Sequence, residues 1–404
     1  MRPAPERPGW QILTGEYAPD PGGVGDYTRL VAEGLAALGA EVQVWAPPSR
    51  SGDAGGDAAP PGVTVRREAG RWSAADFARV GCGIDRAPAP RRILVQFAPN
   101  MYGYRGMNPH LGGWLAGRRR RGDHIRVMFH EVMYVVRPGD GAGRRALARV
   151  QRHLAGRILA AADAVDVSVP AWERLLRPAD PAVGRAYHWR PVPSNIPVVD
   201  DPGAVAAIRA RYAPAVAGSA LVGSFGTFAD DVAAMVAGAV LPLLEGRPDR
   251  AALLIGRGGE RTAERWLRDR PGLAGRVHAT GARGPDDVSR HLQACDVLVQ
   301  PYPGGVCTKR GSLMAGIAHG LPVVTTVGEV TEPFWEGSGA VAMAPEGDAP
   351  ALVALAESLL ADPGARARLG DAARALYEAR CDVSHTVAAL AGVARPGPAE
   401  AAIP

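Results

Sequence analysis

The stretch GGVCTKRGS at 304–312 carries the most distinctive chemistry of the chain. Lys309 is the only lysine among 404 residues, and Arg310 and Ser312 follow it closely. The apolar pattern after Ser312 predicts a helix, so these side chains fall in a loop or in the first turn of that helix. Two cations beside helix N-terminal N–H groups make a strong anion site. The alternative is an exposed basic loop.

A second glycine-rich loop, PDPGGVGDYT, places Gly22, Gly23 and Gly25 between an expected strand and an expected helix. Glycine lets backbone approach a ligand closely, and a helix N-terminus favours negative charge. The loop alone fits a dinucleotide, a diphosphate or simply a tight turn.

His130 and Glu131 follow the apolar run of MFHEV, at the expected end of a strand. Histidine can exchange protons near neutral pH, which suits acid or base chemistry. A buried histidine with satisfied hydrogen bonds is the alternative. The segment 96–115 is rich in Tyr, Met, Trp, Gly and Asn and is a candidate wall for an acceptor, or else a packed Ω-like loop. Its test residues are Asn100, Tyr102, Arg105 and Asn108.

Strand and helix patterns alternate along the chain, which predicts two doubly wound parallel α/β domains. A chain of this length favours two cores over one. We expect an N-terminal domain over 1–197, a second domain over 198–375, and over 376–404 a helix that returns to the first domain, followed by a tail. Ligands in such folds bind at the carboxyl ends of the strands, so a cleft where the two sheets face each other is expected. The expected strands lie at 10–17, 41–47, 91–99, 124–132, 164–170, 186–198, 219–226, 250–258, 276–281, 295–302 and 321–326.

The formal net charge of +5 is mild for this length and is no nucleic-acid signature by itself. It suits an anionic substrate or a weak membrane contact. The run RRRR at 118–121 is either a solvated helix end or a docking point for anionic lipid. The four cysteines lack metal-ligand spacing, and no long apolar run occurs, so we expect a cytoplasmic protein, possibly peripheral at the inner membrane face. The Gly/Pro/Asp-rich segment 50–62 is expected to be a surface loop.

Taken together, the motifs resemble glycosyltransferase family 4, which has the GT-B fold. PDPGGVGDYTRLVAEGLAALGAEVQVWAP resembles the N-terminal strand, glycine loop, helix and strand of that family. LIGRG, ATGARGPDDVSRHLQACDVLVQPY and AGIAHGLPVVTT resemble its second-domain motifs, and YEARCDVSHTV resembles its final helix. The resemblance implies sugar transfer from a nucleotide-diphosphate sugar to an acceptor hydroxyl, usually with retention, without an essential metal and without a cofactor.

The resemblance places His130 near the sugar and Gly23 and Gly25 near the donor diphosphate, and the other site residues are expected from the chain's own motifs. His130, Lys309 and Arg310 are the expected catalytic residues. The expected acceptor-binding residues, besides Asn100, Tyr102, Arg105 and Asn108, are Asp26, Tyr27 and Glu131. The expected donor-binding residues are Gly23, Gly25, Gly226, Arg257, Gly305, Thr308, Ser312, Glu329 and Glu332.

The chain departs from the family where paired glutamates are usual, because Cys307 and Ala315 occupy those positions. The family's basic residues after the first strand of domain two are also absent from GSFGTFADDVA. In one interpretation, Lys309 and Arg310 neutralise the phosphates, and Glu329 or Glu332 supplies a carboxylate. The alternatives are a weak or inactive scaffold or partner subunit, and a nucleotide-sugar 2-epimerase.

Overall fold

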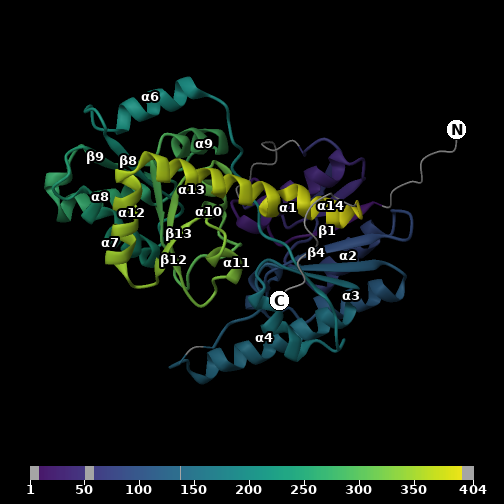
Figure 1. Cartoon of the computed structure of the whole chain (residues 1–404). Coiled ribbons are helices and arrows are strands. Elements are labelled where there is room, and N and C mark those ends of the chain that lie inside the picture. The colour runs from purple at the N-terminus through teal and green to yellow at the C-terminus, as the bar shows by residue number, and fades with distance from the viewer. Residues whose placement is uncertain (1–8, 51–58, 137, 394–404) are drawn as a thin grey trace. The chain divides into compact units, whose positions relative to one another are not determined.

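The computed structural model (Figure 1) describes residues 9–50, 59–136 and 138–393. The chain divides into two units, one of residues 1–191 with 383–404 and the other of residues 192–382. The division falls at 191 and 382, whereas the sequence placed it at 197 and 375. Most of the expected loop at 50–62, and the expected tail beyond 393, lie outside the described residues.

The first unit is built on a seven-stranded parallel sheet in the order β3-β2-β1-β4-β5-β6-β7. Strand order reverses between β1 and β4, so this is the topological switch point of the sheet. The elements of the unit are β1 (Trp10–Leu13), α1 (Gly23–Ala37), β2 (Val42–Trp45), β3 (Val63–Arg66), α2 (Ala74–Ile84), β4 (Arg92–Phe97), the 3-10 turns η1 (Pro99–Tyr102) and η2 (Tyr104–Gly106), α3 (Leu111–Arg120), β5 (His124–Phe129), α4 (Ala142–Ala161), β6 (Ala164–Val167), α5 (Ala171–Leu176), η3 (Arg177–Ala179), β7 (Tyr187–Trp189) and α14 (Val383–Ala391).

The second unit has a six-stranded parallel sheet in the order β10-β9-β8-β11-β12-β13, with its switch point between β8 and β11. Its elements are α6 (Pro202–Tyr212), β8 (Ala220–Phe225), α7 (Asp230–Leu244), β9 (Arg250–Ile255), α8 (Gly259–Asp269), η4 (Pro271–Leu273), β10 (Val277–Gly281), α9 (Pro285–Gln293), β11 (Val297–Gln300), α10 (Gly311–Ala318), β12 (Val323–Val327), α11 (Pro333–Glu336), β13 (Ala342–Pro345), α12 (Ala349–Ala361), α13 (Pro363–Leu376) and the π-helical turn η5 (Tyr377–Cys381).

Both sheets are covered on two faces, which is why their central strands are buried. All four residues of β1 and all six of β9 are buried, and only Gln11 and Arg250 among them are polar. Helices on both faces of a parallel sheet favour such largely apolar runs. The expected fold class, two doubly wound α/β domains, is confirmed. The last helix, α14, belongs to the first unit, where the side chain of Val387 packs against Gly34 of α1 so closely that a Cβ on Gly34 would lie 2.4 Å from it.

The sequence patterns do not predict several elements, because these elements are short or polar. The strand β3 alternates buried and exposed residues over only four positions, and α2 and α3 were not expected. One signal for α2 was available: Ser73 and Asp76 form a capping box, in which each side chain accepts the other's backbone N–H. Residues 111–115 belong to helix α3, so the expected loop ends at Leu111.

The run RRRR at 118–121 lies at the end of helix α3, and three of its four arginines pair with acidic residues. Arg118 is buried and forms ion pairs with Asp85 and Asp123. Arg119 pairs with Asp163, and Arg121 pairs with Asp85. The expectation of a solvated helix end is confirmed for Arg119, Arg120 and Arg121, which are exposed at the end of α3, and is wrong for the buried Arg118. Lipid docking by this run stays a prediction.

We predict that Arg118→Met destabilises the protein by about 3 kcal/mol, because Asp85 and the buried Asp123 lose a partner. Urea unfolding measures this change. The control is Arg120→Met in the same run, where an exposed side chain changes stability by less than about 0.5 kcal/mol. Equal losses in the two variants would contradict the structural role of Arg118.

Candidate functional site

The site in the second unit starts at its switch point, where Gln300 joins the ends of β11 and β8. The Oε1 atom of Gln300 accepts hydrogen bonds from Ser224 Oγ (3.0 Å) and the Phe225 backbone N–H (2.8 Å). Its Nε2 donates to the Phe225 carbonyl (2.8 Å) and to the Tyr302 hydroxyl (3.1 Å). One buried amide thus holds together the two strands between which ligands bind in such sheets.

From Tyr302 the hydrogen-bond chain continues to the start of α10. The Tyr302 hydroxyl lies 2.8 Å from Ser312 Oγ in the first turn of that helix. Burial raises the pKa of Tyr302 to about 12, so the hydroxyl stays protonated. The guanidinium of Arg310 lies over the Tyr302 ring, 4.9 Å from its centre, and its Nη2 donates to the Pro303 carbonyl (2.6 Å). Sequence analysis missed both Gln300 and Tyr302, because polar groups at a strand end carry no motif.

The N-terminus of α10 is a candidate anion site. No side chain caps this helix, whose N-cap residue is Arg310 itself. The buried Nε of Arg310 has no hydrogen-bond partner among the described residues. Lys309 lies half-buried immediately before it. Open helix N–H groups, an unsatisfied guanidinium N–H and a second cation together suit a multiply charged anion.

Glu332 anchors the loop that carries these cations. Its buried carboxylate accepts hydrogen bonds from the Thr308 backbone N–H (2.8 Å), the Thr308 hydroxyl (2.5 Å) and Trp335 Nε1 (2.8 Å). Burial raises the pKa of Glu332, although these hydrogen bonds act in the opposite direction. Both Thr308 and Glu332 are enclosed, and their mutual hydrogen bonds hold the loop. A donor contact by either residue stays a prediction.

The remaining donor-binding candidates surround the same strand ends. Gly305 is buried and has a φ of +89°. A Cβ at this position would lie 2.2 Å from the Gly328 nitrogen, so only glycine allows the loops that contain Gly305 and Gly328 to lie this close together. Glu329 is exposed on the second of these loops. Gly226 and the exposed Arg257 follow β8 and β9, and a Cβ on Gly256 would lie 2.3 Å from the Gly226 carbonyl oxygen.

In the first unit, the glycine loop is occupied by a residue of the chain itself. Glu16 Oε1 accepts hydrogen bonds from the backbone N–H groups of Val24 (2.9 Å) and Gly25 (3.1 Å) at the start of α1. A Cβ on Gly22 would lie 2.3 Å from this carboxylate. The expectation that Gly23 and Gly25 approach a donor diphosphate is therefore not supported, because a carboxylate already fills the anion position. Sequence analysis overlooked Glu16.

His130 lies directly after β5 and is held on several sides. Its Nε2 is 2.8 Å from Gln96 Oε1, and the Tyr27 ring meets its ring edge-on at 4.7 Å between centres. Its carbonyl accepts hydrogen bonds from Ser168 Oγ and Trp172 Nε1. Gln96, also missed from the sequence, sets this ring orientation.

The acceptor-binding candidates divide into exposed and enclosed residues. Asn100, Arg105 and Glu131 are exposed, and Asp26 is half-buried. Tyr27 and Tyr102 are buried, and burial raises the pKa of both phenols. A direct acceptor contact by Tyr27 or Tyr102 is thus not supported.

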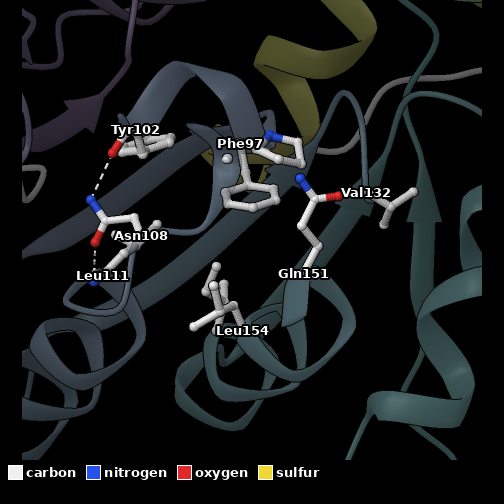
Figure 2. Close-up of a pocket in the computed structure, with 10 residues that line it drawn as sticks. Phe97, Tyr102, Asn108, Leu111, Val132, Gln151 and Leu154 are labelled. Carbon is white, nitrogen blue, oxygen red and sulfur yellow. Dashed lines mark hydrogen bonds between the residues drawn. The ribbon is translucent and has the colours of Figure 1, made fainter. Parts of the chain in front are cut away.

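Asn108 shapes its own loop. Its Nδ2 donates to the carbonyls of Trp72 and Tyr102, while its Oδ1 accepts from His110 and Leu111 N–H groups. Figure 2 shows Asn108 between Tyr102 and Leu111, beside a cavity that includes Phe97, Val132, Gln151 and Leu154 in its lining. The cavity measures about 10 Å³, which is room for one water and not for a sugar. The packed-loop interpretation of this segment is the one that the contacts support.

Among the described residues, no group of three or more His, Cys, Asp or Glu side chains is arranged to hold a metal ion. No helix in the described part of the chain is both long and apolar enough to cross a bilayer.

Comparison with known proteins finds a family model that matches part of the second unit. Residues 220–362 match the family described as "Glycosyl transferases group 1". The match covers 143 of the 404 residues, so it shows that this segment is similar to that family. It spans β8 to α12 and so contains Gln300, Tyr302, Lys309 and Arg310. No curated protein matches the chain.

Solved structures match over the whole fold. Sucrose-phosphate synthase from Thermosynechococcus elongatus has a TM-score of 0.67 at 18% identity, covering 96% of this chain and 98% of its own. HepE from Anabaena, in complex with UDP-glucose, has a TM-score of 0.64 at 17% identity, and the match covers 95% of this chain and 98% of that chain. WaaG, a glycosyltransferase involved in lipopolysaccharide biosynthesis, has a TM-score of 0.64 at 17% identity, and the match covers 96% of this chain and 100% of that chain. The chain has the GT-B fold, and its resemblance to family 4 is consistent with these matches.

We predict that Glu332→Ala lowers the free energy of unfolding by about 3 kcal/mol, because three donors lose a buried acceptor. Urea unfolding followed by tryptophan fluorescence measures this loss. Glu329→Ala, at an exposed carboxylate three residues away, serves as the control and should change stability by less than about 0.5 kcal/mol. A stable Glu332→Ala protein would mean that the loop is held in another way.

Proposed function

We propose that the protein transfers a sugar from a nucleotide-diphosphate sugar to an acceptor hydroxyl, with retention of anomeric configuration and without an essential metal. The observation that carries this proposal is the open N-terminus of α10 beside Lys309 and Arg310, at the switch point of the segment that is similar to group 1 glycosyl transferases. The neighbour HepE is described in complexes with UDP, glucose and UDP-glucose, which supports a donor of this class.

The charges suit the chemistry of the leaving group. As the anomeric bond breaks, the nucleoside diphosphate gains negative charge and the sugar becomes oxocarbenium-like. Fixed N–H dipoles and cations directed at that charge stabilise the transition state. Arg310 is held by Tyr302 and Pro303, and Lys309 precedes it on a loop fixed by Glu332. These residues therefore need little rearrangement when the charge develops.

We assign His130 to a contact with the transferred sugar. Gln96 and Tyr27 fix its ring, so a contact between this ring and the sugar would orient the reacting carbon. No nucleophilic carboxylate is evident among the residues that the structure describes. The acceptor therefore attacks from the same face as the leaving phosphate, which accepts the acceptor's proton.

The two positions where the family usually carries glutamates are not accessible to a donor in this chain. Cys307 and Ala315, which replace them, are fully enclosed. Burial raises the pKa of the Cys307 thiol, so it stays neutral. The proposed substitute carboxylate is Glu329, because it is exposed on the loop next to Gly304, whereas Glu332 is enclosed.

We predict that Lys309→Ala and Arg310→Ala each weaken UDP binding by about 10- to 100-fold, since a charge-assisted hydrogen bond contributes about 1.5–3 kcal/mol. Calorimetry with UDP measures the affinity. Turnover of UDP-, GDP- and dTDP-sugars identifies the donor. Arg283→Ala removes the same charge from the loop after β10, at the edge of the sheet, and should bind UDP like the unaltered protein.

Other results would lead to other functions. If the unaltered protein neither binds nor consumes any donor in the panel, the scaffold alternative holds. A C2-epimerised sugar formed without acceptor would indicate the epimerase. A product of inverted anomeric configuration, read by proton NMR, would overturn retention. An unchanged Lys309→Ala protein would remove the lysine from the site.

A further inference from the structure

Backbone strain in the first unit gathers at one turn after β4. All four residues of the sequence GYRG at 103–106 have φ between +53° and +79°, and we call them the GYRG turn. A side chain makes this left-handed conformation costly, so two consecutive non-glycine residues in it, Tyr104 and Arg105, are unusual. Trp72 also has a positive φ, of 60°. Three of the four non-glycine residues with positive φ in the described part of the chain thus belong to two segments of this unit.

The fold holds these two segments against each other. Asn108 Nδ2 donates to the carbonyls of Trp72 (2.8 Å) and Tyr102 (2.7 Å), and Figure 2 shows the bond to Tyr102. A Cβ on Gly103 would lie 2.7 Å from the Arg71 carbonyl oxygen, so the GYRG turn and the backbone of Arg71 are in close contact. The surroundings therefore fix the strained turn before any ligand arrives.

The strained side chains themselves do little packing. Tyr104 is 46% exposed, and Arg105 is exposed. The Tyr104 ring meets the His110 ring edge-on at 5.5 Å between centres. Neither the Tyr104 hydroxyl nor the Arg105 guanidinium forms a hydrogen bond with a residue that the structure describes. Strain that burial of the same side chains does not offset is typical of ligand sites.

Two guanidinium groups belong to this surface. Arg71 and Arg105 are exposed, and neither side chain forms an ion pair within the described ranges. The stretch from 86 to 122 contains no Asp or Glu. Asp76 accepts the Arg71 backbone N–H, but this carboxylate also bonds Ser73 and pairs with Arg79. The two guanidinium groups are therefore available to an external anion.

We propose that the GYRG turn and Arg71 bind a saccharide that carries an anionic group, a carboxylate or a phosphate, and that this saccharide is the acceptor. The Tyr104 ring covers one face of the sugar, and the guanidinium groups of Arg71 and Arg105 donate to the anionic oxygens. Strands β4 and β5 are parallel neighbours, so the turn after β4 and His130 after β5 lie at the same edge of the sheet. The inference rests on the proposed function, because it names the class of its acceptor.

A charged sugar fits this surface better than a bare anion or a nucleic acid does. A bare anion would use the two guanidinium groups and leave the exposed Tyr104 ring without a contact. A single-stranded nucleic acid needs several aromatic rings and cations repeated along a groove. One exposed phenol beside two cations matches one sugar ring with one anionic substituent.

Saturation-transfer NMR titrations of the full chain test the inference, with glucose, glucuronate, glucose 6-phosphate and inorganic phosphate as probes. We expect the two anionic sugars to bind about tenfold more tightly than glucose or phosphate, because a charge-assisted hydrogen bond adds to the sugar contact. Arg71→Gln and Arg105→Gln should each weaken binding of the anionic sugars about tenfold and leave glucose unchanged. Tyr104→Ala should weaken all three sugars and leave phosphate unchanged.

Matched variants separate this site from general charge and from a structural role. Arg86→Gln removes the same charge from an exposed arginine before β4, at the opposite end of that strand, and should bind every probe like the unaltered protein. Arg105→Gly relieves the strain, so the thermal unfolding midpoint should rise by about 2 °C while binding of the anionic sugars falls as in Arg105→Gln. A purely structural Arg105 would instead lose stability in both variants.

Calorimetry with UDP separates this inference from the proposed function. If the protein binds UDP but binds glucuronate and glucose 6-phosphate no more tightly than glucose, this inference alone is overturned. Selective binding of the anionic sugars without any UDP binding would overturn the proposed function and leave the saccharide site. Equal losses in Arg86→Gln and Arg105→Gln, or phosphate binding as tight as that of glucose 6-phosphate, would also overturn the saccharide site.

Discussion

The candidate site of the second unit depends on one buried carboxylate. Glu332 accepts three hydrogen bonds, two of them from Thr308, and so fixes the loop immediately before Lys309 and Arg310. The Thr308 carbonyl in turn accepts the Val192 N–H, at the residue where the chain enters this unit. A buried carboxylate with satisfied hydrogen bonds is costly to rearrange. The cations on this loop are therefore placed by the fold before any ligand arrives.

The two helix N-termini that looked alike in sequence have opposite electrostatics in the structure. At α1, Glu16 supplies the anion from within the chain and bonds two of the first N–H groups. At α10 no side chain does so, and a guanidinium and an ammonium group add positive charge. The same dipole thus stabilises the chain in one unit and is open to a ligand in the other. A glycine-rich strand-to-helix loop does not by itself identify a phosphate site.

The arginine clusters of the first unit also show that a local sequence motif does not by itself identify a charged site. The four consecutive arginines at 118–121 attract attention in the sequence, yet acidic residues distant from them in sequence neutralise most of that charge. The arginines of α4 are spread over a longer stretch and interrupted by alanine and leucine, so they are inconspicuous in the sequence. Helical geometry gathers them into a stripe without acidic neighbours on the same helix. Charge density on a surface depends on which partners the fold provides.

The sequence by itself determined the alternation of strands and helices, the two-unit α/β class, the loop position of Lys309 and Arg310, and the place of His130 after β5. These follow from local hydrophobic periodicity and from glycine at strand ends, which short stretches encode. Only the tertiary structure decided that Glu332, Thr308, Tyr102 and Asn108 support the fold, and that Gln300, Tyr302, Gln96 and Glu16 shape the sites. Those roles depend on hydrogen bonds between segments distant in sequence, and burial and pairing across such distances leave no local pattern.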